Sequence, residues 1–267
     1  EARAALTRAL EMYGDLLADR PTDSDLARRL AKTHFVIGEL DQEFGMPDDA
    51  LRSLTAALDI QNQLARSNPS NPNYDADQAR TATRIATIHR ASGRHDEALE
   101  WLDRARRLQA EIARTNPERA DFEGDLAETL KTIAAIQSDR DQLAASLTTF
   151  DLAREILQNL VADRPAESQY LFDLVEVYRG IGGLHFKIGD HAAAIRSIQQ
   201  GLVVAEKLVD ENPMVTDFMW SLARCYSSLA RSQTEIHEFD EAIRNHREAR
   251  PILRKLIRLN PTVPDYL

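Results

Sequence analysis

Residues 36–69, VIGELDQEFGMPDDALRSLTAALDIQNQLARSNP, have the pattern of two helices joined by a turn. Gly45 stands where a left-handed residue would end the first helix. Ala50 follows five residues later, where a small side chain lets two helix backbones approach closely. Apolar residues recur at helical spacing from Ala50 to Leu64, and the Asn-Pro pair ending at Pro69 closes the segment. The stretch therefore predicts an antiparallel helix pair.

The same pattern returns every 48 residues along the chain, without an insertion or deletion. A proline closes each unit, at Pro21, Pro69, Pro117, Pro165, Pro213 and Pro261. The turn between the helices recurs as EFGMPDDAL, ASGRHDEAL, DRDQLAASL, KIGDHAAAI and EIHEFDEAI. Asp141 and His237 replace the turn glycine in two units, and both residue types tolerate positive φ better than most. A fixed period of this kind indicates a repeat architecture, in which residues 48 apart occupy equivalent positions.

Each repeat is expected to contribute a helix A and a helix B. Helix A is predicted at 24–44, 72–92, 120–140, 168–188 and 216–236, and helix B at 48–67, 96–115, 144–163, 192–211 and 240–259. We expect an all-α fold, an α-solenoid of antiparallel helix pairs with about five and a half repeats in one domain over residues 1–267. Its parts are helix B of a truncated repeat at 1–21, full repeats at 22–69, 70–117, 118–165, 166–213 and 214–261, and the start of a missing helix at 262–267.

The two ends of the chain lack the polar capping helices that solenoids need for solubility. The chain is therefore predicted to be a fragment whose uncapped ends associate end to end.

Composition excludes several classes of partner and compartment. The net charge of −10 argues against nucleic-acid binding through the overall field. No apolar run approaches the roughly 18 residues of a membrane span, so no membrane association is expected. The single cysteine, Cys225, cannot form an internal disulfide, which agrees with a reducing, cytoplasmic compartment.

No arrangement of residues indicates catalysis, a cofactor or a metal site. His89 and His185 occupy equivalent positions two repeats apart, which is too far to share a metal ion. Cys225 is equivalent to Thr33, Thr81 and Thr129, so we interpret it as a small buried residue. A nucleophilic cysteine would need a placed base, and none is identifiable. The chain is predicted not to be an enzyme.

Four of the ten glycines cluster at Gly180, Gly182, Gly183 and Gly189. Their spacing does not match a dinucleotide or phosphate loop. Gly182 is equivalent to Gly38, and Gly189 is the turn residue. Gly180 and Gly183 are surplus, and each costs about 1 kcal/mol relative to alanine in a helix interior. Either they have drifted in a helix that packing stabilises, or they bare the backbone for a ligand.

These motifs resemble the tetratricopeptide repeat family. Ile37-Gly38, Gly45, Ala50, Ala57 and Pro69 match its signature in order, although its usual unit has about 34 residues. Such long-unit arrays look like those attached to bacterial serine/threonine protein kinases. The resemblance implies a right-handed superhelix with helix A on its concave face.

The function expected is that of a non-enzymatic scaffold that binds a peptide or partner protein in its concave groove. The alternative is a regulatory or substrate-docking segment of a larger bacterial serine/threonine protein kinase or other signalling enzyme. Aromatic residues and arginines most often carry binding energy. They gather, with one glycine, at the predicted partner-binding residues Phe172, Arg179, Gly183, Phe186, Trp220, Arg224 and Arg231.

The expected partner of this patch is a protein segment with acidic or phosphorylated residues beside an apolar one. Two alternatives stay open. Phe172 and Trp220 could be buried between repeats, and Glu176 could pair with Arg179 or Arg224 and occupy it internally.

Overall fold

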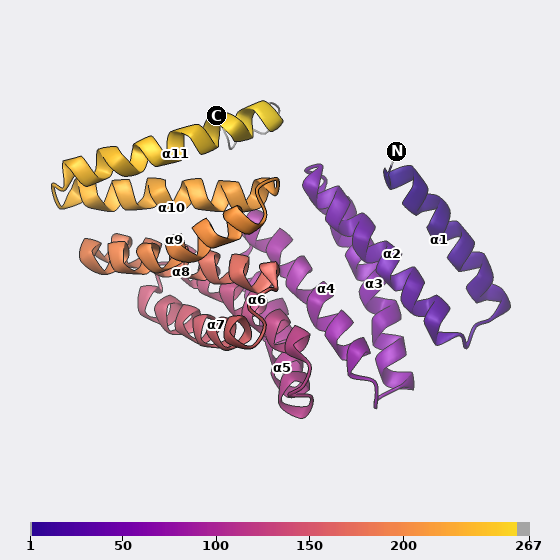
Figure 1. The fold of residues 1–267 in the computed structure, drawn as a ribbon. Coiled ribbons are helices and arrows are strands. Elements are labelled where there is room, and N and C mark those ends of the chain that lie inside the picture. Colours follow the sequence, from indigo (N-terminus) through magenta and orange to yellow (C-terminus); the bar gives the residue numbers. More distant parts are fainter. Residues whose placement is uncertain (1, 261–267) are drawn as a thin grey trace. The chain divides into compact units, whose positions relative to one another are not determined.

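The structure is a computed structural model and describes residues 2–260. That range is 86% helical, with eleven helices and no strand (Figure 1). The helices are α1 (Ala2–Asp19), α2 (Ser24–Glu43), α3 (Pro47–Ser67), α4 (Pro72–Ala91), α5 (His95–Thr115), α6 (Ala120–Asp139), α7 (Leu143–Asp163), α8 (Ser168–Ile188), α9 (His191–Glu211), α10 (Thr216–Glu235) and α11 (Phe239–Leu259). The predicted all-α solenoid of antiparallel helix pairs is confirmed, and the ten predicted helices begin and end within one residue of their expected bounds.

The helix ends follow the local signals of the sequence. Pro47 and Pro72 occupy the first helical position of α3 and α4, where proline removes no needed hydrogen bond. The side chain of Asp23 caps α2 by accepting hydrogen bonds from the backbone N–H groups of Asp25 and Leu26. Helix α11 continues through Pro251. The residues expected to start a further helix, 262–267, lie outside the described residues.

The turns between helix A and helix B adopt the predicted left-handed conformation. The angle φ is +70° at Gly45, +73° at Gly93 and +87° at Gly189. The two residues that replace glycine are left-handed as well, with φ of +57° at Asp141 and +63° at His237. These are the only positive-φ residues other than glycine in the described chain.

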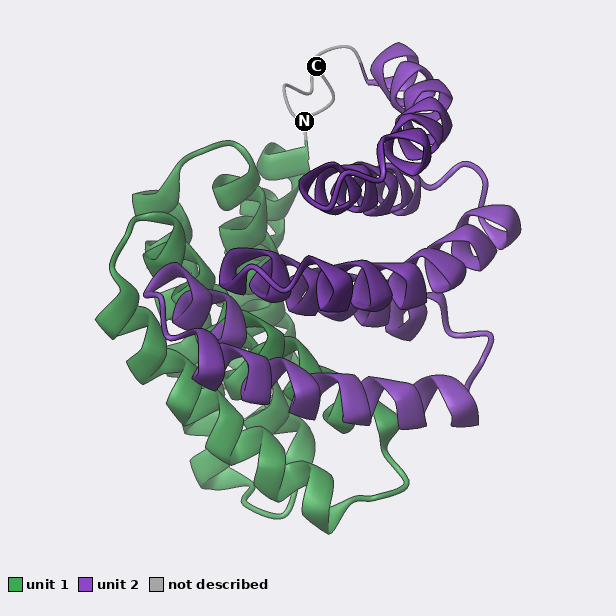
Figure 2. Ribbon diagram, turned by 90° about the vertical axis from the view of Figure 1, so that its left-hand side faces the viewer, with its two compact units in different colours: residues 1–132 green, residues 133–267 purple. Residues whose placement is uncertain are grey.

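The chain forms two compact units, residues 1–132 and 133–267 (Figure 2). We call them unit 1 and unit 2. In each unit consecutive helices pack on one another, and helices A of neighbouring repeats also touch, α2 with α4 and α8 with α10. The expectation of one continuous solenoid domain over residues 1–267 stays a prediction.

Each unit has its own apolar core. In unit 1 it includes Ala50, Leu54, Leu58, Ile85 and Ile88, which come from α3 and α4. In unit 2 it includes Val175, Ile198, Ala205, Leu222, Cys225 and Leu229, which come from α8, α9 and α10. The same repeat positions therefore build both cores, so the period in the sequence is a period of burial.

Glycines within helix A permit close packing against helix B. A Cβ atom on Gly182 would lie 2.5 Å from Cγ1 of Ile198, so the position requires glycine. A Cβ atom on Gly180 would lie within 3.0 Å of three ring atoms of the buried Phe150. Gly180 therefore has a packing role, which neither of the two interpretations of the sequence had included.

None of the helices between residues 2 and 260 combines the length and the apolar character that a membrane span requires.

Candidate functional site

The seven predicted binding residues all lie in unit 2, on helices α8 and α10. Phe172, Arg179, Gly183 and Phe186 come from α8, and Trp220, Arg224 and Arg231 come from α10. These are helices A of adjacent repeats, and they touch each other. We refer to these seven residues as the unit 2 patch.

Two arginines of the patch lie over aromatic rings. The guanidinium carbon of Arg231 lies 4.0 Å from the ring centroid of Phe186, and that of Arg224 lies 5.9 Å from the Trp220 ring. Both arginines are exposed, and both rings are half-buried. The Phe186 ring also meets the ring of His191 edge-on, with 5.0 Å between centroids. Each stack desolvates one face of a ring and leaves charge at the surface.

Phe172 belongs to a second aromatic contact. Its ring centroid lies 5.4 Å from that of Phe218 in the next helix A. Phe172 is half-buried, as is Trp220, so neither ring is fully enclosed between repeats. Gly183 is also half-buried, and a Cβ atom there would meet no atom within 4 Å. The surface beside Gly183 is therefore open.

Glu176 ties two of the predicted arginines together. Its carboxylate accepts a hydrogen bond from Arg179 at 2.6 Å and another from the hydroxyl of Ser221 at 2.6 Å. Arg224 lies 3.8 Å from the same carboxylate. Arg179 is only 12% exposed, and its Nε is buried without a hydrogen-bond partner among the described residues. Arg179 therefore holds Glu176 in place, and the two arginines at the surface of the patch are Arg224 and Arg231.

The electrostatics of Glu176 follow from these contacts. Burial by itself would raise the pKa of the Glu176 carboxyl, because a charged group loses hydration. Arg179, the Ser221 hydroxyl and Arg224 outweigh that cost, and the pKa is lowered below the ordinary value of 4.5. Glu176 is therefore a carboxylate at neutral pH.

Cys225 lies in the core of unit 2. It is fully buried, and burial raises the pKa of its thiol to about 12. The thiol stays protonated at neutral pH and is a poor nucleophile. This agrees with the interpretation of Cys225 as a small core residue.

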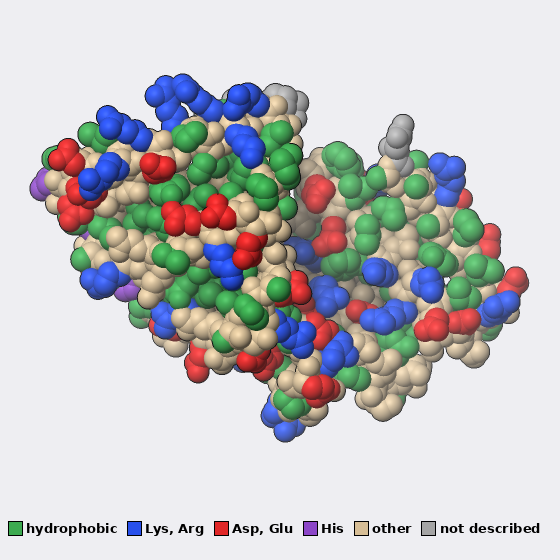
Figure 3. Space-filling view, in the orientation of Figure 1, with side chains coloured by type: hydrophobic (Ala, Val, Ile, Leu, Met, Phe, Trp, Pro, Cys, Tyr) green, Lys and Arg blue, Asp and Glu red, His purple; other side chains and the backbone are tan. Residues whose placement is uncertain are grey.

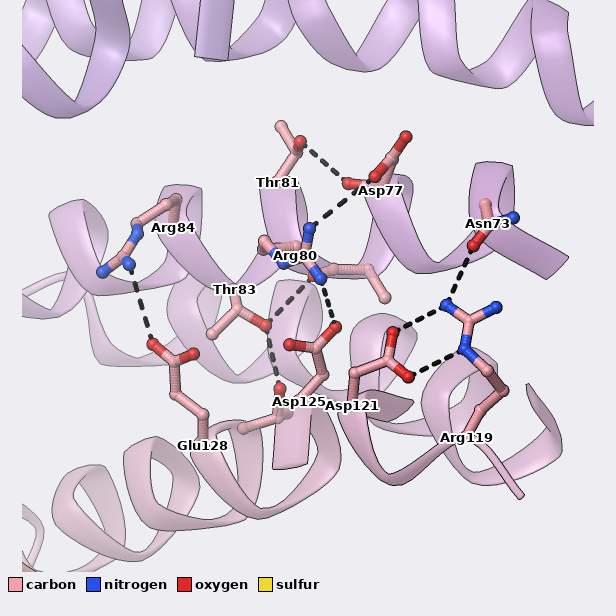
Figure 4. Close-up of polar contacts among 12 residues, drawn as sticks. Asn73, Asp77, Arg80, Thr81, Thr83, Arg84, Arg119, Asp121, Asp125 and Glu128 are labelled. Atoms are coloured by element: carbon pink, nitrogen blue, oxygen red, sulfur yellow. Dashed lines mark hydrogen bonds and ion pairs between the residues drawn. The ribbon is translucent and has the colours of Figure 1, made fainter. Parts of the chain in front are cut away.

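Unit 1 carries a chain of ion pairs between helices A of successive repeats. Arg28 contacts Asp77 at 2.8 Å, Arg80 lies 3.7 Å from Asp77, and Arg80 contacts Asp125 at 2.7 Å (Figure 4). Arg84 makes a parallel set with Glu39 at 2.8 Å and Glu128 at 3.8 Å. The buried hydroxyls of Thr83 and Thr129 share a hydrogen bond of 2.9 Å beneath these pairs (Figure 4). We call this set the unit 1 ladder.

Burial acts differently on the two ends of one ladder pair. Loss of hydration raises the pKa of the Asp125 carboxyl, and the nearby Arg80 only partly offsets this. Burial would lower the pKa of Arg80, but Asp125 and Asp77 outweigh it and the pKa is raised. Both arginine and aspartate are held chiefly by each other.

Beside the ladder, a groove of about 550 Å³ opens between α2 and α4. Arg28, Arg29, Lys32, Phe35 and Val36 line it from α2, Gln61 from α3, and Asp77 and Arg80 from α4. Arg28, Lys32 and Phe35 stand at positions that the repeat pattern assigns to the ligand face, but the sequence gave no reason to prefer them. The signal for the ladder was the spacing of 45 to 49 residues between opposite charges, as from Arg28 to Asp77 and from Arg80 to Asp125.

Charge is unevenly distributed on the surface of unit 2. Lysine and arginine gather over α11, which forms the upper edge of the view in Figure 3. This helix carries Arg244, Arg247, Arg250, Arg254, Lys255 and Arg258. A chain with a net charge of −10 therefore still has a local basic surface.

Comparisons with known proteins agree with this architecture. The family model for the tetratricopeptide repeat matches residues 78–113, which span α4 and α5. No curated protein gives a significant sequence match.

Several solved structures share the fold at low sequence identity. BtubC (BKLC) from P. vanneervenii superimposes with a TM-score of 0.73 at 19% identity, covering 98% of this chain and 92% of BtubC. Nearly identical TPR-like repeats of a kinesin light chain from Podosopora anserina give a TM-score of 0.53 at 18% identity, covering 86% of this chain and 97% of theirs. A Rap protein in complex with competence and sporulation factor gives 0.56 at 13% identity, covering 91% of this chain and 59% of Rap. The chain is therefore a tetratricopeptide-like repeat protein, with the family's sequence signature in residues 78–113.

Proposed function

We propose that this chain is a non-enzymatic protein-interaction module and that it binds a segment of a partner protein at the unit 2 patch. The observation that carries the proposal is the pair of stacked arginines on adjacent helices A, Arg231 over Phe186 and Arg224 over Trp220. Core packing is supplied by other positions, such as Leu222 and Leu229. The stacked pairs are therefore available for contact with a partner.

The chemistry of the patch defines the partner segment. Half-buried rings offer apolar contact, and the arginines above them offer donors in a planar fork that suits carboxylate or phosphate. Arg224 already lies 3.8 Å from Glu176, so Arg231 is the better placed of the two to accept a new anion. The partner segment would carry an apolar side chain beside aspartate, glutamate or a phosphorylated residue.

The fold supports this role in general terms. A Rap protein with this fold is known in complex with competence and sporulation factor. Repeat arrays of this class offer extended surfaces to other molecules. The proposal extends that role to this chain and to the residues of the unit 2 patch.

The test is affinity capture with the intact chain, followed by mass spectrometry and by measurement of the recovered partner's dissociation constant. The variant Arg231→Glu combined with Phe186→Ala should weaken binding by tenfold or more, and binding of the wild type should weaken as salt is added. Arg179 should not be substituted, because its burial links it to the fold.

The matched control is Arg196→Glu, which reverses an exposed charge on α9 in the same unit. Thermal unfolding establishes that both variants keep the fold. Unchanged affinity in the patch variant, or an equal loss in the control, would exclude the unit 2 patch as the binding surface.

A further inference from the structure

We infer that the groove between α2 and α4 in unit 1 is a second binding site, for an extended protein segment with an acidic residue and, two residues along, an apolar residue. The inference rests on the proposed function in one respect, which is that the ligand is a segment of a protein. The two sites lie in different units, so each can fail without the other.

The cations of the groove fall into two groups. Arg28 and Arg80 are occupied by Asp77 and Asp125 of the unit 1 ladder. Arg29 and Lys32 also line the groove, both are exposed, and neither has an ion pair within the part of the chain that the structure describes. They lie three residues apart on α2 and so face the same side of the helix. The groove therefore offers two uncommitted positive charges at one place.

An apolar section follows these charges along α2. Phe35 and Val36 line the groove three and four residues after Lys32, and both are half-buried. At 1.5 Å per residue the charge and the apolar section are separated by about 4.5 to 6 Å along the helix axis. In an extended peptide, side chains two residues apart point to the same side and lie about 6.6 Å apart. A carboxylate opposite Lys32 would thus place the second residue onward against Phe35 and Val36.

The floor of the groove has an unpaired hydrogen-bond acceptor. Gln61 is 4% exposed, and its Oε1 is buried without a partner among the described residues. Its backbone carbonyl is already engaged, since it accepts a hydrogen bond from the Gln78 side chain at 3.2 Å. In unit 2 the equivalent position is Leu157, so the fold does not need an amide there. A backbone N–H of a bound segment would supply the missing donor, which is costly to leave unmade.

The acidic residues of the groove favour a protein segment over a nucleic acid. Asp25, Glu39 and Asp77 line the same groove as the cations. A polyanion would meet these carboxylates along its length and be repelled, whereas a single carboxylate opposite Arg29 and Lys32 would not. The site is thus complementary to one negative charge with an apolar neighbour.

The test uses ten-residue fluorescent peptides in a glycine and serine background, titrated into the intact isotope-labelled chain. One peptide carries Glu-Ser-Leu, a second carries Glu-Leu, and a third carries Lys-Ser-Leu. The Glu-Ser-Leu peptide should bind at least about threefold more tightly than the other two and shift the amide NMR signals around Lys32, Phe35 and Gln61. Equal binding of all three peptides, binding by none, or shifts confined to other helices would overturn the inference.

Variants then identify the residues. Lys32→Glu should lower affinity for the Glu-Ser-Leu peptide about tenfold, which is the scale of one charge-assisted hydrogen bond. Gln61→Leu should lower it severalfold and leave the fold intact, because leucine occupies the equivalent position in unit 2. Arg66→Glu reverses an exposed charge on α3 outside the groove and should have no effect. An equal loss in Arg66→Glu would show a general charge effect and refute the site.

The unit 2 variant separates the two proposals. Arg231→Glu should leave binding of the Glu-Ser-Leu peptide unchanged. If the captured partner ignores the unit 2 patch while the peptide still binds unit 1, only the proposed function fails. If the peptides fail while the partner depends on Arg231, only the unit 1 site fails.

Discussion

Two neighbouring glycines of α8 differ in what surrounds them. A Cβ atom on Gly180 would press on the ring of Phe150, whereas one on Gly183 would meet no atom within 4 Å. Gly180→Ala should destabilise the protein by about 1–3 kcal/mol, because the ring must leave its packed position. Gly183→Ala should stabilise it by up to about 1 kcal/mol, since alanine is the better helix former.

Urea unfolding of both variants checks this prediction. The substitution is chemically identical and the positions are three residues apart on one helix, so each variant controls for the other. A stabilising effect of Gly180→Ala would show that the Phe150 ring moves aside without cost.

Glu176 is the residue whose charge the structure of unit 2 depends on most. Its folded pKa is depressed below 4.5, so its contribution to stability is complete above the unfolded value and is lost as pH falls through the folded value. Glu176→Gln leaves the buried Arg179 without its counter-charge and should cost about 1–3 kcal/mol at pH 7. The difference from wild type should shrink as the pH is lowered below 4.5.

Urea unfolding at pH 7 and at successively lower pH values measures this difference. Glu211→Gln is the control, because Glu211 is half-exposed and lies 3.9 Å from an equally exposed Lys207. A difference between Glu176→Gln and wild type that does not change with pH would contradict the assignment of a charged Glu176.

At the scale of the element, the helix A to helix B turn has one backbone conformation and two kinds of residue. Asp141 has φ of +57°, where a residue with a Cβ atom is strained, while Gly93 adopts +73° without strain. Asp141→Gly should therefore stabilise the protein by about 1 kcal/mol, and Gly93→Asp should destabilise it by a similar amount. The midpoints of urea unfolding measure both changes, and a shift in the same direction for the pair would contradict the argument.

At the scale of the whole molecule, the two units differ in how polar their cores are. Gln109 is 3% exposed and its Oε1 is buried without a partner in the described chain, and Leu157 fills the equivalent position in unit 2. Gln109→Leu should stabilise unit 1 by about 1–2 kcal/mol by removing an unsatisfied acceptor. Hydrogen exchange should then slow in α4 and α5 and stay unchanged in α8 and α9, because repeats interact mainly with their neighbours.

The reverse substitution, Leu157→Gln, should speed exchange in α7 and α8. A uniform change over all helices in either variant would mean that the two units unfold as one, and this would contradict separate core stabilities.

The helices and their turns could be predicted from the sequence because their causes are local. Proline every 48 residues prevents helix continuation, and the residue at the turn determines where the left-handed conformation can occur. Even Asp141 and His237 could be assigned positive φ, since they occupy the glycine position of the repeat. The burial of Cys225 was predictable for the same reason, as its equivalents are small residues.

Only the tertiary structure decided which side chains are free to act. Arg179 and Arg231 look alike in the sequence, yet Arg179 is buried against Glu176 while Arg231 lies exposed over Phe186. The unit 1 ladder likewise joins charges 44 to 49 residues apart, and no local pattern orders such pairs. Backbone periodicity follows from hydrogen bonds between near neighbours in the chain. The pairing of long charged side chains depends on distances between repeats, which exist only once the helices have packed.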